Sequence, residues 1–142
     1  MPMTVAAQNF EKGLNAYNAG DYATTLEEWE PLAQQGEANV QYNLGLMYLR
    51  GYGVPTDYAE AVKWWRLAAE QDSSEAQTNL GFMYSNGDGV IQDNAEALKW
   101  WRLAAEQGII QAQFNLGILY EAGQGVPTDY AEAVKWWRLA AE

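Results

Sequence analysis

The sequence predicts an all-α protein, a right-handed α/α solenoid of about four helical hairpins, and two observations lead to this fold class. The first is an internal repeat, because the segment AVKWWRLAAE at 61–70 returns almost unchanged at 97–106 and 133–142, a spacing of 36 residues. Self-similarity at a period of roughly 20 to 50 residues is typical of solenoids. The second is helical periodicity: apolar side chains recur every three or four residues throughout each repeat.

Each repeat is predicted to form two helices, at about 38–50 and 58–71 in the first copy. Gly51 fits the left-handed residue that ends a helix, and Asp57 is placed to cap the next one. Glu60 stands three residues after Asp57, which is the spacing of a capping box. The apolar stripe expected on the second helix consists of Tyr58, Ala61, Val62, Trp65, Ala68 and Ala69.

One hairpin cannot bury both of its apolar faces, whereas stacked hairpins can, so the chain is predicted to be one repeat domain over 1–142. The N-terminal unit keeps the period at Asp21, Tyr22 and Trp29 with a shorter connecting loop. The expected units are 1–36, 37–72, 73–108 and 109–142.

Two small features of the repeat have expected structural roles. Gly45, Gly81 and Gly117 lie inside the first helices, where glycine costs about 1 kcal/mol relative to alanine, so we expect a close helix crossing there. The first tryptophan of each pair, with Leu67 in the first copy, is expected to meet the next unit.

The pattern A-x-x-x-L-G-x-x-Y-x-x-G-x-G-V-x-x-D, followed by A-x-x-W and A-A, resembles the Sel-one-like repeat, a relative of the tetratricopeptide repeat. The resemblance covers about 37–142, while "GLNAYNAGDYATTLEEW" followed by Pro31 looks more like a plain tetratricopeptide unit. It implies an interaction scaffold of a kind that is often bacterial and envelope-associated or secreted. The subgroup with cysteine-bridged repeats is a poor comparison, because this chain has no cysteine.

The composition argues against most kinds of chemistry. The chain has 8 basic and 19 acidic residues, a net charge of −11, which disfavours nucleic acid and anionic membranes. It has no histidine and no cysteine, and the regularly spaced carboxylates are assigned to helix caps, so we predict no enzyme, cofactor or metal site. The segment NGDGVIQD lacks the spacing of a calcium loop. No signal peptide is visible, so the default expectation is cytoplasmic, with periplasmic or secreted also open.

The resemblance to tetratricopeptide units, whose first helices line a concave groove, implies a binding surface for a protein or peptide. The implied positions differ between the units although the second helices are nearly copied. They are Asn39, Tyr42, Leu46, Leu49 and Arg50 in the first repeat, Glu75, Thr78, Phe82, Ser85 and Asn86 in the second, and Gln111, Phe114, Ile118, Glu121 and Ala122 in the third. The alternative for Phe82 and Ile118 is packing between hairpins. The repeated Asn43, Asn79 and Asn115 either bind a ligand backbone or join neighbouring units.

Two functions therefore remain open. The first is a non-catalytic scaffold that holds a protein segment in the concave groove through apolar anchors. The alternative is a small acidic bacterial inhibitor of the immunity type, whose charge would attract a basic partner and make association depend steeply on salt.

The last repeat carries an apolar stripe that nothing in the sequence covers. A solenoid usually closes with a polar capping helix, and the segment 130–141 is not polar. Two explanations are open: the sequence is part of a longer array, or two copies form a homodimer through this hairpin, with the candidate contact residues Tyr130, Val134, Trp137 and Ala141.

Overall fold

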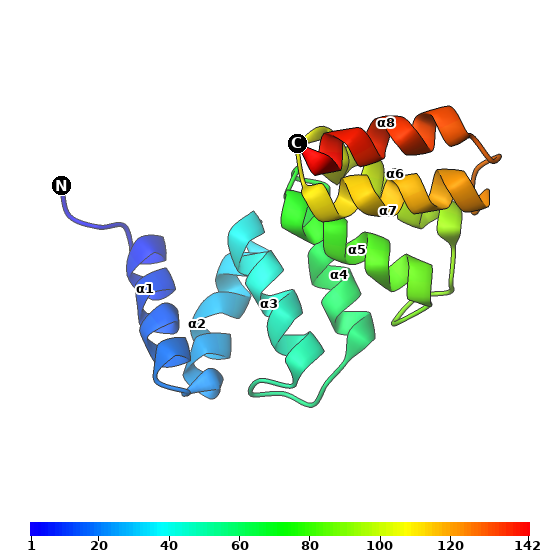
Figure 1. Cartoon of the computed structure of the whole chain (residues 1–142). Coiled ribbons are helices and arrows are strands. Elements are labelled where there is room, and N and C mark those ends of the chain that lie inside the picture. Colours follow the sequence, from blue (N-terminus) through cyan, green and yellow to red (C-terminus); the bar gives the residue numbers. More distant parts are fainter.

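The computed structural model describes all residues 1–142 and contains eight helices and no strand. Figure 1 shows them following one another along an arc from α1 to α8. The prediction of an all-α solenoid of four hairpins is confirmed. The helices are α1 Val5–Asn18, α2 Tyr22–Gln34, α3 Ala38–Arg50, α4 Tyr58–Ala69, α5 Ser74–Asn86, α6 Asn94–Glu106, α7 Ile110–Ala122 and α8 Tyr130–Ala141.

Packing is almost confined to helices that are consecutive in the sequence. The closest pairs are the two helices of each hairpin, and each hairpin then packs on the next through α2 with α3, α4 with α5, and α6 with α7. A chain in which each unit contacts only its neighbours has no single central core. Its stability comes from hairpins and from the junctions between them.

The helix ends follow the predicted residues with one difference. Gly51 ends α3 in the left-handed conformation at φ 71°, and the Asp57 side chain accepts from the Glu60 N–H at 3.1 Å. The expected capping box is not closed, because the Asp57 N–H donates instead to the Tyr48 carbonyl at 3.0 Å. The Glu60 side chain lies 3.8 Å from Lys63 instead.

The second tryptophan of each pair explains the glycine inside each first helix. A Cβ on Gly81 would overlap the Trp101 indole, approaching its Cε2 to 2.6 Å. The Trp101 Nε1–H donates to the Thr78 carbonyl at 3.0 Å, so the ring is fixed across the glycine. The same arrangement recurs in the other hairpins as Gly13 with Trp29, Gly45 with Trp65, and Gly117 with Trp137.

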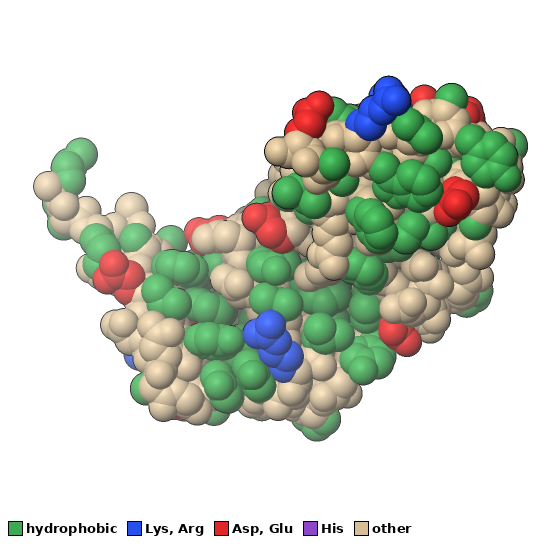
Figure 2. Space-filling model, viewed as in Figure 1, with side chains coloured by type: hydrophobic (Ala, Val, Ile, Leu, Met, Phe, Trp, Pro, Cys, Tyr) green, Lys and Arg blue, Asp and Glu red, His purple; other side chains and the backbone are tan.

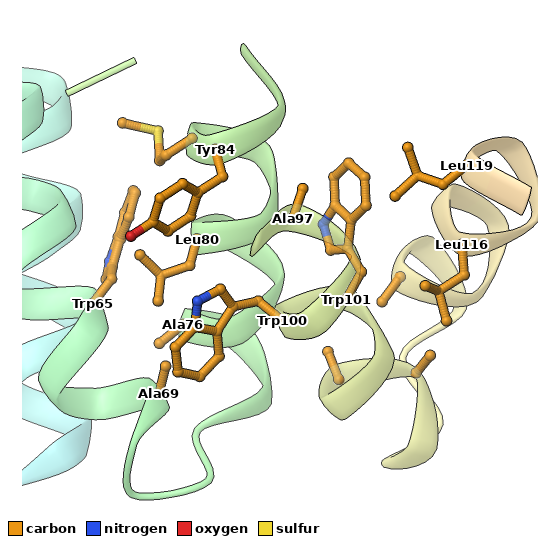
Figure 3. Packing of buried hydrophobic residues seen from close by; sticks show 14 of the residues in the cluster. Trp65, Ala69, Ala76, Leu80, Tyr84, Ala97, Trp100, Trp101, Leu116 and Leu119 are labelled. Carbon is orange, nitrogen blue, oxygen red and sulfur yellow. The ribbon is translucent and has the colours of Figure 1, made fainter. Parts of the chain in front are cut away.

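The first tryptophan of each pair packs backwards, so the expectation that it meets the next unit was wrong. Trp64 is 6% exposed and belongs to a cluster with Trp29 and Leu32 of the preceding hairpin. Figure 3 shows Trp100 in the same role beside Ala69. The residue expected beside Trp64, Leu67, remains 39% exposed and borders a hollow that Ala33 of the preceding hairpin also lines.

The buried apolar side chains form two clusters. Seven buried residues join the N-terminal hairpin to α3 and α4, and twenty others run from α4 to α8. Five of the six stripe residues expected on α4 are buried, but Tyr58, the first residue of the helix, is 44% exposed.

Candidate functional site

The four first helices of the hairpins present one apolar side chain each along a common face. These side chains follow the helical glycine directly and form what we call the apolar row, which consists of Leu14, Leu46, Phe82 and Ile118. Leu14 is 37% and Ile118 39% exposed, while the other two are partly buried. Figure 2 shows hydrophobic side chains gathered across this face with few charged groups between them.

Two hollows connect successive members of the apolar row. The first, of about 150 Å³, lies between the N-terminal hairpin and α3, and both Leu14 and Leu46 line it. The second, of about 340 Å³, lies between α3 and α5, and both Leu46 and Phe82 line it. The row is therefore continuous across three hairpins, and its gaps are open enough to take side chains of another molecule.

The structure brings together most of the positions implied for the first repeat. Tyr42, Leu46, Leu49 and Arg50 all line the second hollow, whereas Asn39 is exposed outside it. Arg50 also lies over the Tyr52 ring, with its Cζ 5.9 Å from the ring centroid.

The second and third repeats contribute fewer of the implied residues. Phe82 reaches the hollow and packs edge-on against Trp101, with ring centroids 5.3 Å apart, so it takes part in both alternatives weighed for it. Thr78 is 5% exposed and its hydroxyl donates to the Ser74 carbonyl, so this residue does not face the groove. Phe114 is 52% exposed. The remaining positions, Glu75, Ser85, Asn86, Gln111, Glu121 and Ala122, are exposed or partly buried and line neither hollow.

Sequence reasoning missed the contribution of the N-terminal hairpin. Leu14, Tyr17 and Trp29 line the first hollow, with Tyr17 stacked at 6.1 Å from the Trp29 ring. The signal was present, because Gly13–Leu14 corresponds to the Gly45–Leu46 step of the first repeat. The shorter loop after α1 displaces this step from the 36-residue period, which hid the equivalence.

A row of asparagines accompanies the apolar row. Asn43 lines the first hollow and Asn79 the second, each two residues before its helical glycine. The third member, Asn115, has a buried Nδ2 that finds no hydrogen-bond partner. Because this atom is buried, a bound chain could not reach it without movement of the side chain, and only Asn43 and Asn79 border the hollows.

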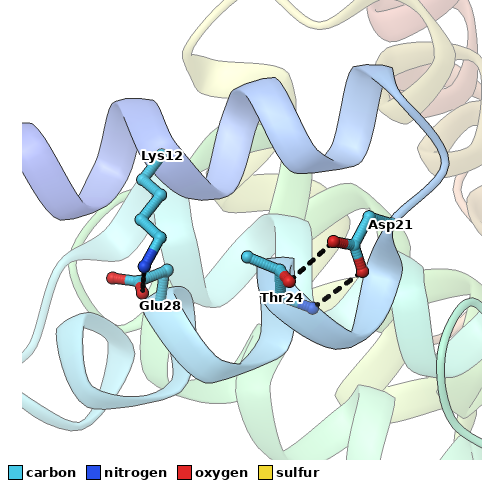
Figure 4. A network of polar contacts seen from close by, with 4 residues as sticks. All are labelled: Lys12, Asp21, Thr24 and Glu28. Carbon is cyan, nitrogen blue, oxygen red and sulfur yellow. Dashed lines mark hydrogen bonds and ion pairs between the residues drawn. The ribbon is translucent and has the colours of Figure 1, made fainter.

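The displaced pKa values belong to structural contacts outside this face. Burial, with Glu30 nearby, raises the pKa of Tyr48 to about 12, and its hydroxyl donates to Glu30 at 3.2 Å across the α2–α3 junction. The hydrogen bond from Lys12 to Glu28 raises the pKa of Lys12, and the hydrogen bond that the Thr24 hydroxyl donates to Asp21 lowers the pKa of Asp21 (Figure 4). None of these groups lines the apolar row.

Neither a membrane-spanning helix nor a cluster of metal-binding side chains is present. None of the eight helices combines the length and the apolar character needed to cross a bilayer. No three acidic side chains gather into a group that could hold a metal ion.

The repeats match a known family model, and the fold matches solved structures. The model of the Sel1 repeat matches residues 38–73, 74–109 and 110–142. A Sel1 repeat protein from Oxalobacter formigenes is 36% identical with a TM-score of 0.84, over 91% of this chain and 53% of that one. The protective antigen c5321 of uropathogenic Escherichia coli, described as an SLR fold, is 42% identical with a TM-score of 0.87, over 96% and 30%.

A more distant structure shares the fold alone. The cysteine-rich protein B of Helicobacter pylori is 20% identical with a TM-score of 0.64, over 86% of this chain and 88% of that one. No curated protein sequence matches the chain. The chain spans about half of the Oxalobacter protein and less than a third of the Escherichia coli antigen.

Proposed function

Because the chain belongs to the Sel1 repeat family, we propose that it is a non-catalytic scaffold that binds a protein or peptide segment along the apolar row. Proteins built from Sel1 repeats generally serve as protein–protein interaction scaffolds and are generally not catalytic. The proposal adds a location and a binding mode to this general role.

The observation that carries the proposal is the exposed apolar row with its two hollows. Leu14 and Ile118, at opposite ends of the row, keep 37% and 39% of their surface exposed, although α7 buries Leu116 of the same helix completely. Contiguous apolar surface on a soluble chain marks an interaction site. The hollows of about 150 and 340 Å³ would accept apolar side chains of the bound segment.

The mechanism is presentation of a preorganised surface. The tryptophan hydrogen bonds fix the two helices of each hairpin, as Trp65 to the Tyr42 carbonyl at 3.0 Å illustrates, so the lining residues need little ordering on binding. Apolar anchors would supply affinity, while the amides of Asn43 and Asn79, which line the two hollows, would bond the backbone of the segment.

The test is selection of peptides from a random peptide library displayed on phage, followed by titration of a selected synthetic peptide. The double variant Leu14→Ala with Ile118→Ala, at the two ends of the apolar row, should weaken binding at least tenfold and retain helicity. The matched control is Leu67→Ala with Leu103→Ala, which removes side chains of similar exposure, 39% and 38%, from the second helices. Equal loss of binding in both variants, or none in the first, would contradict the proposal.

The acidic-inhibitor alternative makes a different prediction for the same titration. Apolar anchoring should change the dissociation constant little between about 50 and 500 mM NaCl, because salt screens charges and not apolar contacts. Steering by the net charge of −11 should weaken binding steeply over that range. A steep loss would favour the inhibitor.

A further inference from the structure

The two hollows of the apolar row have only one charged residue in their walls. This residue is Arg50, in the last turn of α3, and every other side chain that lines either hollow is apolar, aromatic or an asparagine. Figure 2 shows a basic group over α3, among hydrophobic side chains. A positive charge at this place is notable because the chain has 8 basic residues against 19 acidic ones.

Arg50 has no acidic partner within the chain. Five other basic side chains have polar partners: Lys12, Lys63 and Lys135 form ion pairs, and Arg66 and Arg102 donate to tyrosine hydroxyls. The Arg50 side chain is exposed and lies over the Tyr52 ring, with its Cζ 5.9 Å from the ring centroid. A guanidinium has five N–H donors, which a ring face does not satisfy, so these donors are available to an acceptor from another molecule.

The helix that carries Arg50 does not need the charge in order to end. A cation in the last turn of a helix interacts favourably with the helix dipole. The corresponding positions of α5 and α7 nevertheless hold Asn86 and Ala122, and both helices end in a left-handed glycine as α3 does. The charge is therefore a property of the hollow between α3 and α5 and not of the repeat.

We propose, building on the function proposed above, that the bound segment carries an aspartate or glutamate whose carboxylate pairs with Arg50, while an apolar side chain beside it enters the hollow of about 340 Å³. A guanidinium can bind a carboxylate through two parallel N–H···O bonds. The net charge of −11 favours a carboxylate over a phosphate, because a phosphate group would bring up to about two negative charges into the field of the chain.

The position of Arg50 limits where the acidic residue stands in the segment. Leu46 lines both hollows and precedes Arg50 by four residues, so their Cα atoms are separated by about 6 Å along α3. An extended segment covers this length in about two residues, and a helical one in about four. The acidic residue should therefore lie within about two residues of the apolar anchor in an extended segment, or about four in a helical one.

The test uses the peptides selected from the random library on phage. An acidic residue should recur among them at a fixed distance from an apolar one. A selected peptide is then synthesised in two forms, one as selected and one with the acidic residue replaced by its amide. The unmodified chain should bind the acidic form about fivefold more tightly, as expected of an exposed ion pair. Arg50→Gln should bind both forms equally, because it removes the partner of the carboxylate.

The matched control is Lys99→Gln, which removes one positive charge from α6, where the residue lines neither hollow. It should keep the fivefold preference, which separates the local pair from the change in net charge. Arg50→Gln should keep the circular dichroism spectrum of the unmodified chain, since the other repeats have no charge at this position. As a second measurement, Arg50→Glu should prefer a peptide form in which lysine replaces the acidic residue.

The outcomes distinguish failure of the carboxylate pairing from failure of the proposed function. Peptides that bind through Leu14 and Ile118 but contain no recurrent acidic residue would overturn the pairing and leave the proposed function standing. A preference for the acidic form that persists unchanged in Arg50→Gln would do the same, and so would tighter binding of a phosphoserine form. Peptides that bind the Leu14→Ala with Ile118→Ala variant as well as the unmodified chain would overturn both.

Discussion

Replacing Gly81 by alanine tests the packing that repeats through all four hairpins. Intrinsic helix propensity alone predicts that Gly81→Ala stabilises the protein by about 1 kcal/mol, because alanine restricts the unfolded chain and favours helix. The structure predicts the opposite sign. The new Cβ would overlap Nε1 and Cδ1 of the Trp101 indole and would lie 2.6 Å from its Cε2.

The size of the destabilisation follows from the overpacking and from the hydrogen bond that a displaced indole would lose. Forcing an extra methyl into a packed site costs about 1 to 3 kcal/mol. Moving the ring also weakens the buried bond from the Trp101 Nε1–H to the Thr78 carbonyl, now 3.0 Å, which is worth about 1 kcal/mol. Subtracting about 1 kcal/mol for propensity leaves a net loss of about 1 to 3 kcal/mol in the free energy of unfolding.

The assay is urea unfolding followed by circular dichroism at a helical wavelength, with Gly81→Ala, Trp101→Leu and the double variant compared to the unmodified chain. If the alanine acts through the indole, the double variant should be more stable than the sum of the two single effects predicts, by about 1 kcal/mol or more. A Gly81→Ala protein at least as stable as the unmodified chain would refute the reasoning. If the free-energy effects of the two single variants simply add in the double variant, the alanine does not act through the Trp101 indole.

Two further predictions concern a helix cap and a tyrosine. Asp93→Ala should lower the free energy of unfolding by about 1 kcal/mol in urea titration, because its carboxylate accepts from two backbone N–H groups, whereas Glu96→Gln should change it little. The folded-state pKa of Tyr48, about 12, exceeds its ordinary 10.0, so the stability it contributes is complete below pH 10 and is lost as the pH rises towards 12. Tyr48→Phe should flatten that decline in unfolding experiments, and an unchanged slope would contradict the assignment.

The fold could be predicted from the sequence because the residues that begin and end helices recur at the same positions in three aligned repeats. Gly51 with Asp57, for example, marks a helix end and a helix start, and both boundaries agree with the structure. Helical periodicity alone could not decide the direction in which Trp64 packs. Both tryptophans lie on the apolar arc, and only the positions of the neighbouring hairpins show that Trp64 contacts the one before it.

The candidate site could be predicted less completely. Comparing variable with copied positions found Tyr42, Leu46 and Phe82, which line one hollow. It included Thr78, because variability between units does not distinguish an exposed side chain from a small buried one whose hydroxyl bonds its own helix. It omitted Leu14, because the shorter loop of the N-terminal hairpin breaks the period on which the comparison depends.

The division of the buried side chains into two clusters has a mechanical consequence. Twenty of them bind α4 to α8 into one continuous body, whereas the N-terminal hairpin is joined through a separate set of seven. The α2–α3 junction is the least extensive of the junctions between hairpins, so we expect the superhelix to bend there most easily. Because Leu14 and Leu46 lie on opposite sides of this junction, its bending would widen or narrow the first hollow and so adapt one end of the apolar row to segments of different thickness.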